Sequence, residues 1–170
     1  MTRLLLVLAC VLLAALAVWG MRAGWRHRAQ RQAHLPSLPL RPDALGEPRI
    51  AAVTGLYVGT TFATSWQDRV VHAGLGSRAA ATVALYPEGV LVDRVGEQPV
   101  FIPAASIVGV RLAPGLAGKV VGEGGLLVVR WRLGDTELDT GFRADDRAAY
   151  PVWIRTAEDM GSDTGERSRG

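Results

Sequence analysis

The sequence contains few of the residues that build metal and thiol sites. Of its 170 residues one is cysteine, Cys10, and three are histidine. A single cysteine excludes a disulfide framework and a cysteine-rich zinc site. The histidines are far apart, and neither an H-x-H nor an H-E-x-x-H pattern occurs. We therefore expect no bound metal, no cofactor and no catalytic residues.

The chain also lacks a basic globular part, although its net charge is +3. Residues 1–49 carry seven Arg against two acids, a net of +5. Residues 50–170 carry twelve basic residues against fourteen acids, a net of −2, and the two parts sum to the overall +3. A protein that binds a phosphate backbone needs a basic face. The charge distribution therefore argues against nucleic acid as a partner.

A long apolar run opens the chain. From Leu4 to Met21 no residue is charged and none is proline. Eighteen helical residues extend about 27 Å, close to the hydrocarbon thickness of a bilayer. The run predicts a transmembrane anchor over residues 1–21, with the lipid bilayer as its partner. Cys10 lies in a sequence that loosely resembles a lipobox, but the apolar run continues well beyond it.

The flanking charges predict the orientation of this anchor. Ala15-Leu16-Ala17 also fits a signal-peptide cleavage site, which is the alternative. Against cleavage, arginines follow the run while only Arg3 precedes it, and short arginine-rich flanks stay in the cytoplasm. We expect a retained single-pass anchor in the cell membrane, with the N-terminus outside and the rest cytoplasmic. The arginines expected to contact the membrane surface are Arg22, Arg26, Arg28 and Arg31.

Residues 22–49 form a basic juxtamembrane segment and then a proline-rich linker, which we expect to act as an extended spacer. From Ile50 onward, short apolar runs alternate with turn residues at intervals of about 8–12 residues, which is typical of a sandwich or barrel. The domain is expected over residues 50–160. Its seven strands, mainly antiparallel, are predicted at 51–57, 78–86, 90–95, 100–102, 106–112, 125–133 and 136–142.

Alternation in the predicted strand 125–133 places Leu127, Val129, Trp131 and Leu133 on one face, with Arg130 and Arg132 on the other. A helix is expected within residues 144–160, with a break near Pro151 and with Asp145-Asp146 as its N-terminal caps. The tryptophans of the domain are predicted to be core or barrel-cap residues; they are Trp66, Trp131 and Trp153. Residues 161–170 are predicted to be a disordered tail.

One glycine-rich segment carries a candidate ligand contact. The residues from Ala113 to Val120 resemble a phosphate-binding loop but lack its first glycine and its final hydroxyl residue. The simpler interpretation is a loop between strands. Lys119, the single lysine of the chain, lies in it and is a candidate contact for an anionic ligand.

Several blocks of the sequence resemble the membrane-anchored PH-like domain proteins of actinobacteria. They are GLYVGTTFATSWQDRVVHAGLGSRAAATVALYPEGVLVDR, FIPAASIVGVR, GLAGKVVGEGGLLVVRW and LDTGFRADDR, which together lie within about residues 50–158. The resemblance implies a mainly β fold, in which a seven-stranded PH-like split barrel is capped by a C-terminal α-helix behind one transmembrane helix. It also implies no known enzymatic activity.

Two functions remain open from the sequence. The first is a non-catalytic binding or scaffolding module at the cytoplasmic face of the membrane, which holds an unidentified partner: a protein, a peptide or a lipid headgroup. The alternative is an accessory component of an export or transport system. A single span cannot form a conduction pathway, because solute needs a protein-lined route. A transport role would therefore require oligomers or a separate channel subunit.

Overall fold

The computed structural model describes residues 2–32, 35–120 and 125–157. The chain divides into two compact units, Met1–His34 and Leu35–Gly170. The predicted tail at 161–170 and the end of the predicted helix at 158–160 lie outside the described residues. Each unit is described by itself below.

The first unit consists of one helix, α1 (Thr2–Arg31), which contains the whole apolar run. Its described large apolar side chains are exposed, from 45% at Val18 to 70% at Trp19, and Cys10 is exposed as well. In the described part of the chain, no helix combines the length and the apolar character that a membrane crossing needs. The structure therefore confirms that the apolar run is helical, but it does not confirm the predicted membrane crossing.

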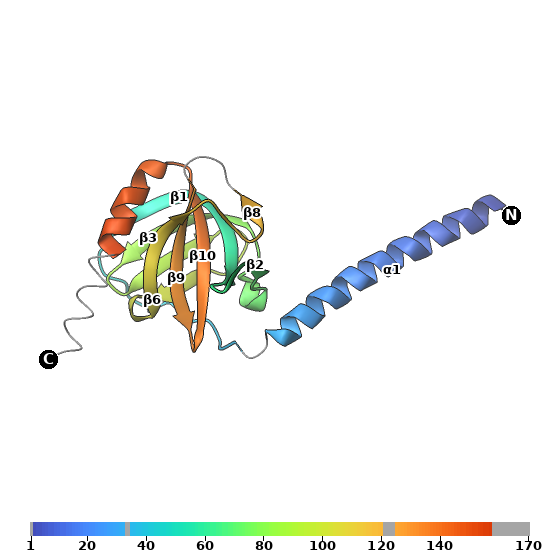
Figure 1. The fold of residues 1–170 in the computed structure, drawn as a ribbon, viewed down its shortest axis with the longest axis horizontal. Helices are drawn as coiled ribbons and strands as arrows, with labels where there is room; N and C mark the ends of the chain where they lie inside the picture. The colour runs from blue at the N-terminus through green and yellow to red at the C-terminus, as the bar shows by residue number, and fades with distance from the viewer. Residues whose placement is uncertain (1, 33–34, 121–124, 158–170) are drawn as a thin grey trace. The chain divides into compact units, whose positions relative to one another are not determined.

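The second unit is built on one antiparallel sheet (Figure 1). Seven strands follow one another in the order β5-β4-β3-β1-β10-β9-β6, and β2 pairs with β1 beside this path. The sheet is open, with β5 and β6 at its two edges. The strands are β1 (Ile50–Phe62), β2 (Ser65–Arg69), β3 (Ala79–Tyr86), β4 (Gly89–Arg94), β5 (Val100–Pro103), β6 (Ile107–Ala113), β9 (Leu126–Leu133) and β10 (Thr136–Ala144), while β7 (Gly115–Leu116) and β8 (Lys119–Val120) form a separate hairpin.

Each of the seven predicted strands has a counterpart in the structure, and their pairing is antiparallel as expected. The prediction ended the first strand five residues early, because Gly59 and the threonines after it interrupt the apolar pattern. A bulge between Tyr57 and Gly59 lets β1 continue to Phe62. The prediction also missed β2, β7 and β8, which are short and carry no clear alternation.

One face of the sheet encloses the main core. Leu127, Val129, Trp131 and Leu133 of β9 all lie in it, as the alternation predicted. A smaller apolar cluster lies around Val58, Leu116 and Val128. Gly141 makes close packing possible there, because a Cβ at this position would come within 2.6 Å of the Leu116 side chain.

A chain of buried polar groups crosses the main core. The Tyr57 hydroxyl donates to the Leu75 carbonyl oxygen at 2.7 Å and lies 2.8 Å from Thr60 Oγ1. Thr60 Oγ1 lies 2.8 Å from Thr140 Oγ1, which also accepts a hydrogen bond from Trp131 Nε1 at 2.9 Å. Burial raises the pKa of Tyr57 to about 12, because the phenolate would lose its hydration. The network satisfies polar groups that would otherwise destabilise the core.

The C-terminal segment forms a 3₁₀ turn (Arg147–Ala149) followed by helix over residues 150–157. The Asp146 side chain accepts a hydrogen bond from the Ala148 backbone N–H at 2.9 Å, so the predicted cap is confirmed at Asp146. Pro151 lies in the first helical turn, where its missing N–H has no cost. Trp153 is 1% exposed and belongs to the main core.

The prediction for Trp66 was wrong. Its side chain is 44% exposed, because β2 pairs beside the main path of the sheet and not over the core. Trp131 is fully buried, as expected.

The segment before β1 also differs from the expected spacer. Leu35 is 4% exposed within the main core, and Leu38 packs against that core. The Pro36 carbonyl oxygen lies 3.1 Å from His72 Nε2. The Gly46 backbone N–H donates to the Glu88 carboxylate, at 3.2 and 3.3 Å from its two oxygens. We call residues 35–46 the strap. Because Leu35 and Leu38 pack on the domain, the segment follows a defined path.

Candidate functional site

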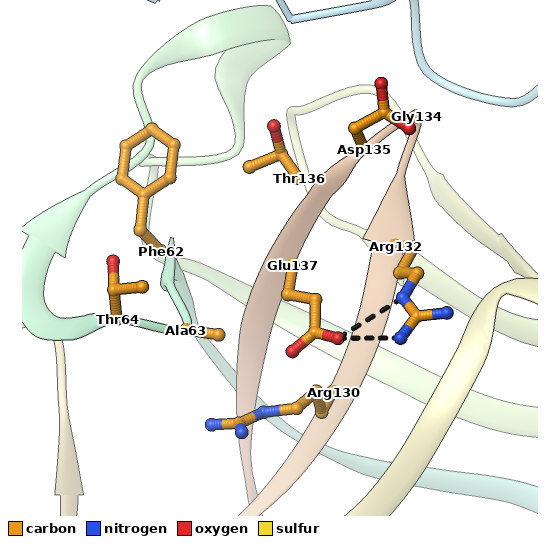
Figure 2. Close-up of a pocket in the computed structure, with 9 residues that line it drawn as sticks. All are labelled: Phe62, Ala63, Thr64, Arg130, Arg132, Gly134, Asp135, Thr136 and Glu137. Carbon is orange, nitrogen blue, oxygen red and sulfur yellow. Dashed lines mark hydrogen bonds and ion pairs between the residues drawn. The ribbon is translucent and has the colours of Figure 1, made fainter.

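A depression of about 710 Å³ lies where the hairpin of β9 and β10 meets the end of β1 (Figure 2). It contains aromatic, hydroxyl, basic and acidic side chains. The residues that line it are Phe62, Ala63, Thr64, Arg130, Arg132, Gly134, Asp135, Thr136 and Glu137.

The two arginines of the depression come from the outer face of β9. Residues two apart in a strand share a face, so Arg130 and Arg132 lie opposite to Trp131. The register of the hairpin then brings acids of β10 beside them: Arg132 pairs with Glu137 and Arg130 with Asp139. Opposite charges placed directly across two strands attract each other.

Arg132 and Glu137 form the outer pair. Arg132 Nη2 lies 3.0 Å from Glu137 Oε1, and Nε lies 3.2 Å from the same oxygen (Figure 2). The Arg132 side chain is 61% exposed and that of Glu137 37%. Water screens such a pair, so its contribution to stability is small. Both groups are accessible to a ligand.

Asp139 forms an inner cluster with two arginines. Arg130 makes a bidentate contact with it, through Nε to Oδ1 at 2.8 Å and Nη2 to Oδ2 at 3.0 Å. Arg111 of β6 adds Nη2 to Oδ2 at 2.7 Å. We call Arg111, Arg130 and Asp139 the arginine cluster.

The arginine cluster is buried at its centre and open at its edge. The Asp139 side chain is 3% exposed, whereas those of Arg111 and Arg130 are 45% and 33% exposed. The hydrogen bond to Asp139 raises the pKa of Arg130 above its ordinary value. Thr61, which pairs with Asp139 across β1 and β10, has a buried Oγ1 with no hydrogen-bond partner in the described part of the chain.

This arrangement suits binding. Two arginines share one carboxylate, so the cluster keeps one surplus positive charge, and its guanidinium groups are held in place by charge-assisted hydrogen bonds. A planar guanidinium can bind a further carboxylate or phosphate. Among the residues that the structure describes, no three His, Cys, Asp or Glu side chains come together as a metal site.

None of the described residues that line this depression was predicted as a ligand contact. Lys119 lies in β8, paired with Leu116, and its side chain is outside what the structure describes. The four predicted membrane-surface arginines all lie in α1, where Arg22 is exposed. The side chains of Arg26, Arg28 and Arg31 are outside the described residues.

Sequence reasoning placed Arg130 and Arg132 on the face of their strand opposite to Trp131 but did not assign them a role. It missed Arg111, Glu137 and Asp139. The available signal was the short turn at Gly134-Asp135, which fixes the register and so pairs two arginines with two acids. Arg111 could not be placed in the same way, because β6 reaches β9 through a long connection.

Comparison with known protein families places the chain in context. The family described as bacterial PH domain-like matches residues 35–158, which include the strap and the whole sheet. No curated protein matches the chain.

Proposed function

The chain belongs to the bacterial PH domain-like family, and from this premise we propose that it is a non-catalytic binding module, anchored by α1 at the cytoplasmic face of the cell membrane. It would then resemble the single-pass, membrane-anchored PH-like proteins to which several blocks of its sequence are similar. The observation that carries the binding role is the arginine cluster beside the depression. A buried carboxylate there holds two arginines whose outer edges remain exposed.

The anchor rests on the composition and exposure of α1. Eighteen successive residues from Leu4 to Met21 carry no charge. The described apolar side chains of this run are 45% or more exposed. So much exposed apolar surface is unfavourable in water and favourable in lipid. The arginines that follow Met21 favour a cytoplasmic domain.

A topology reporter tests the anchor and its orientation. We expect the full chain to remain with the membrane after a high-salt or alkaline wash, and a fragment beginning at Leu35 to be released. A reporter that is active only outside the cytoplasm, fused after Gly170, should be silent. Strong activity of that fusion would contradict the proposed orientation, and release of the full chain by the wash would contradict the proposed anchor.

The binding role needs a partner, which crosslinking in native membranes followed by mass spectrometry can identify. We expect Arg132→Ala to weaken capture of the specific partner at least several-fold. Its matched control is Arg155→Ala, which removes an exposed arginine of the C-terminal helix. Equal capture by both variants would argue against the depression as the binding site.

The identity of the captured partner distinguishes the two functions. Soluble enzymes or regulators would support a scaffold. Channel subunits would support the alternative, an accessory role in export or transport. In that case the chain would act beside a conduction pathway supplied by other subunits.

A further inference from the structure

The two edges of the sheet differ in how they are protected. β5 is four residues long, ends at Pro103 and buries Val100, Phe101 and Ile102. β6 has seven residues, and in the described part of the chain it pairs with β9 alone (Figure 1). A strand at an edge presents unpaired N–H and C=O groups, which proteins protect by a short strand, by proline or lysine, or by a bulge. β5 has such protection along its length, whereas β6 has it only at its start.

The second part of β6 is the unprotected one. The bulge lies between Ile107 and Gly109, where the register with β9 shifts. From Gly109 to Ala113 the pairing is regular, and these residues include neither proline nor lysine. We call Gly109–Ala113 the free edge. Successive residues of a strand direct their backbone groups to opposite sides, so every second residue of the free edge offers its N–H and C=O groups away from β9.

The central side chains of the free edge alternate between apolar and charged. Val110 and Leu112 lie opposite Val129 and Leu127, on the face of the sheet that carries the main core. The Leu112 side chain is 47% exposed there. Arg111 lies on the other face, in the arginine cluster, and its side chain is 45% exposed. Because the cluster holds two guanidinium groups and one carboxylate, a second carboxylate beside Arg111 would be attracted to it.

We infer that the free edge binds an extended peptide segment of a partner protein, which pairs with β6 as an additional strand. This inference rests on the proposed binding role and names the chemistry of the partner. Residues directly opposite each other on paired strands have Cβ atoms about 4.5–5.5 Å apart. The peptide therefore carries an acidic residue opposite Arg111, with apolar residues before and after it, opposite Val110 and Leu112. Backbone hydrogen bonds supply affinity, and the alternating side chains supply specificity.

A second copy of the chain fits the free edge less well. β6 contains no acidic residue, so no register between two β6 strands places a carboxylate opposite Arg111. An antiparallel pair centred on Arg111 would place the two arginines directly opposite each other, and like charges in that position repel. Charge therefore favours a different, acidic strand as the occupant.

Peptide selection tests the chemistry of this surface. A phage library that displays random twelve-residue peptides is selected on the full chain, which is held in mild detergent through a tag after Gly170. We expect the selected peptides to share an Asp or Glu between two apolar residues. In the central part of such a peptide, N-methylation of single amides should abolish binding at every second position, because only alternate amides face β6. Loss of binding at no position, or without this alternation, would overturn the inference.

Variants and hydrogen exchange place the selected peptide on the domain. Arg111→Ala should weaken its binding about two- to fivefold, whereas Arg78→Ala, at an exposed arginine before β3, should not. Leu112→Ser should also weaken it, and Val95→Ser, at a side chain 74% exposed, is the matched control. Amide exchange should slow in the free edge when the peptide binds, and not in β5. Unchanged exchange in the free edge would overturn the inference.

The outcomes separate this inference from the proposed function. If crosslinking captures a partner that depends on Arg132 while no peptide slows exchange in the free edge, the binding role stands and the inference fails. If the peptides bind the free edge but the wash releases the full chain from membranes, only the proposed anchor fails. Exchange in the free edge that slows with protein concentration alone would make a second copy the occupant, which also overturns the inference.

Discussion

At the residue scale, the side chains of β9 separate two roles. Trp131 and its apolar neighbours at alternate positions fill the core, while Arg130 and Arg132 face outward toward acids of β10. Burying Asp139 costs hydration free energy, which the three hydrogen bonds from Arg111 and Arg130 offset. On the outer face, these hydrogen bonds hold the charged side chains in defined positions, as packing does in the core.

Trp153 provides a direct test of the core. Its side chain is 1% exposed, and its Nε1 has no hydrogen-bond partner in the described part of the chain. Trp153→Ala therefore removes packing without removing a hydrogen bond. We expect a loss of roughly 3–5 kcal/mol in the free energy of unfolding, measured by urea denaturation. Val152→Ala, at a side chain 43% exposed, should change it far less. Similar effects of the two variants would place Trp153 at the surface.

Tyr57 predicts how stability depends on pH. Its pKa is raised from 10.0 to about 12, so between these values the folded state holds a proton that the unfolded state releases. Stability is therefore complete below pH 10 and falls as the pH rises toward 12, by roughly 2–3 kcal/mol. Denaturation curves across this range check the slope. Tyr57→Phe lowers stability at neutral pH, because it removes the bond to Leu75, but it should flatten the slope above pH 10. If stability of the variant still fell above pH 10 as steeply as in the unchanged protein, the loss would come from a group other than Tyr57.

At the scale of elements, long alternating strands could be predicted and short ones could not. The strand around Trp131 alternates from Val129 to Leu133, which gave its position and the face that carries Trp131. β7 and β8 have two residues each, too few for any period. β2 has the sequence SWQDR, which does not alternate, and its tryptophan is exposed. The strand forms because the end of the long β1 offers it a partner. Such contacts are set by tertiary structure.

The N-terminal cap of the last helical segment can be tested at Asp146. Its carboxylate accepts the Ala148 N–H at 2.9 Å, and the segment that follows carries Tyr150 and Trp153 into the core. Asp146→Ala should lower the free energy of unfolding by about 1 kcal/mol, whereas Asp146→Asn keeps an acceptor and should cost less. Chemical denaturation of both variants measures the difference. Equal losses would assign the effect to charge.

At the scale of the whole molecule, the boundary of the domain was the least predictable feature. A segment with four prolines has no helical or strand period, so its composition predicts an extended linker. Its place on the domain depends on features far along the chain, such as Gly134, which leaves room for Pro36, and Glu88, which accepts from Gly46. The match to the family likewise begins at residue 35, with the strap.

Truncation measures what the strap contributes. We expect a fragment of residues 35–160 to be soluble, to show a strand-dominated circular dichroism spectrum and to unfold cooperatively. A fragment beginning at Asp43 lacks Leu35 and Leu38 and should lose at least about 2 kcal/mol, since burying one leucine contributes about 1.5–3 kcal/mol. Within the longer fragment, Leu35→Ser should reproduce most of that loss. Leu40→Ser, at a side chain 91% exposed, should not. Equal stability of the two fragments in urea would show that the strap does not brace the domain.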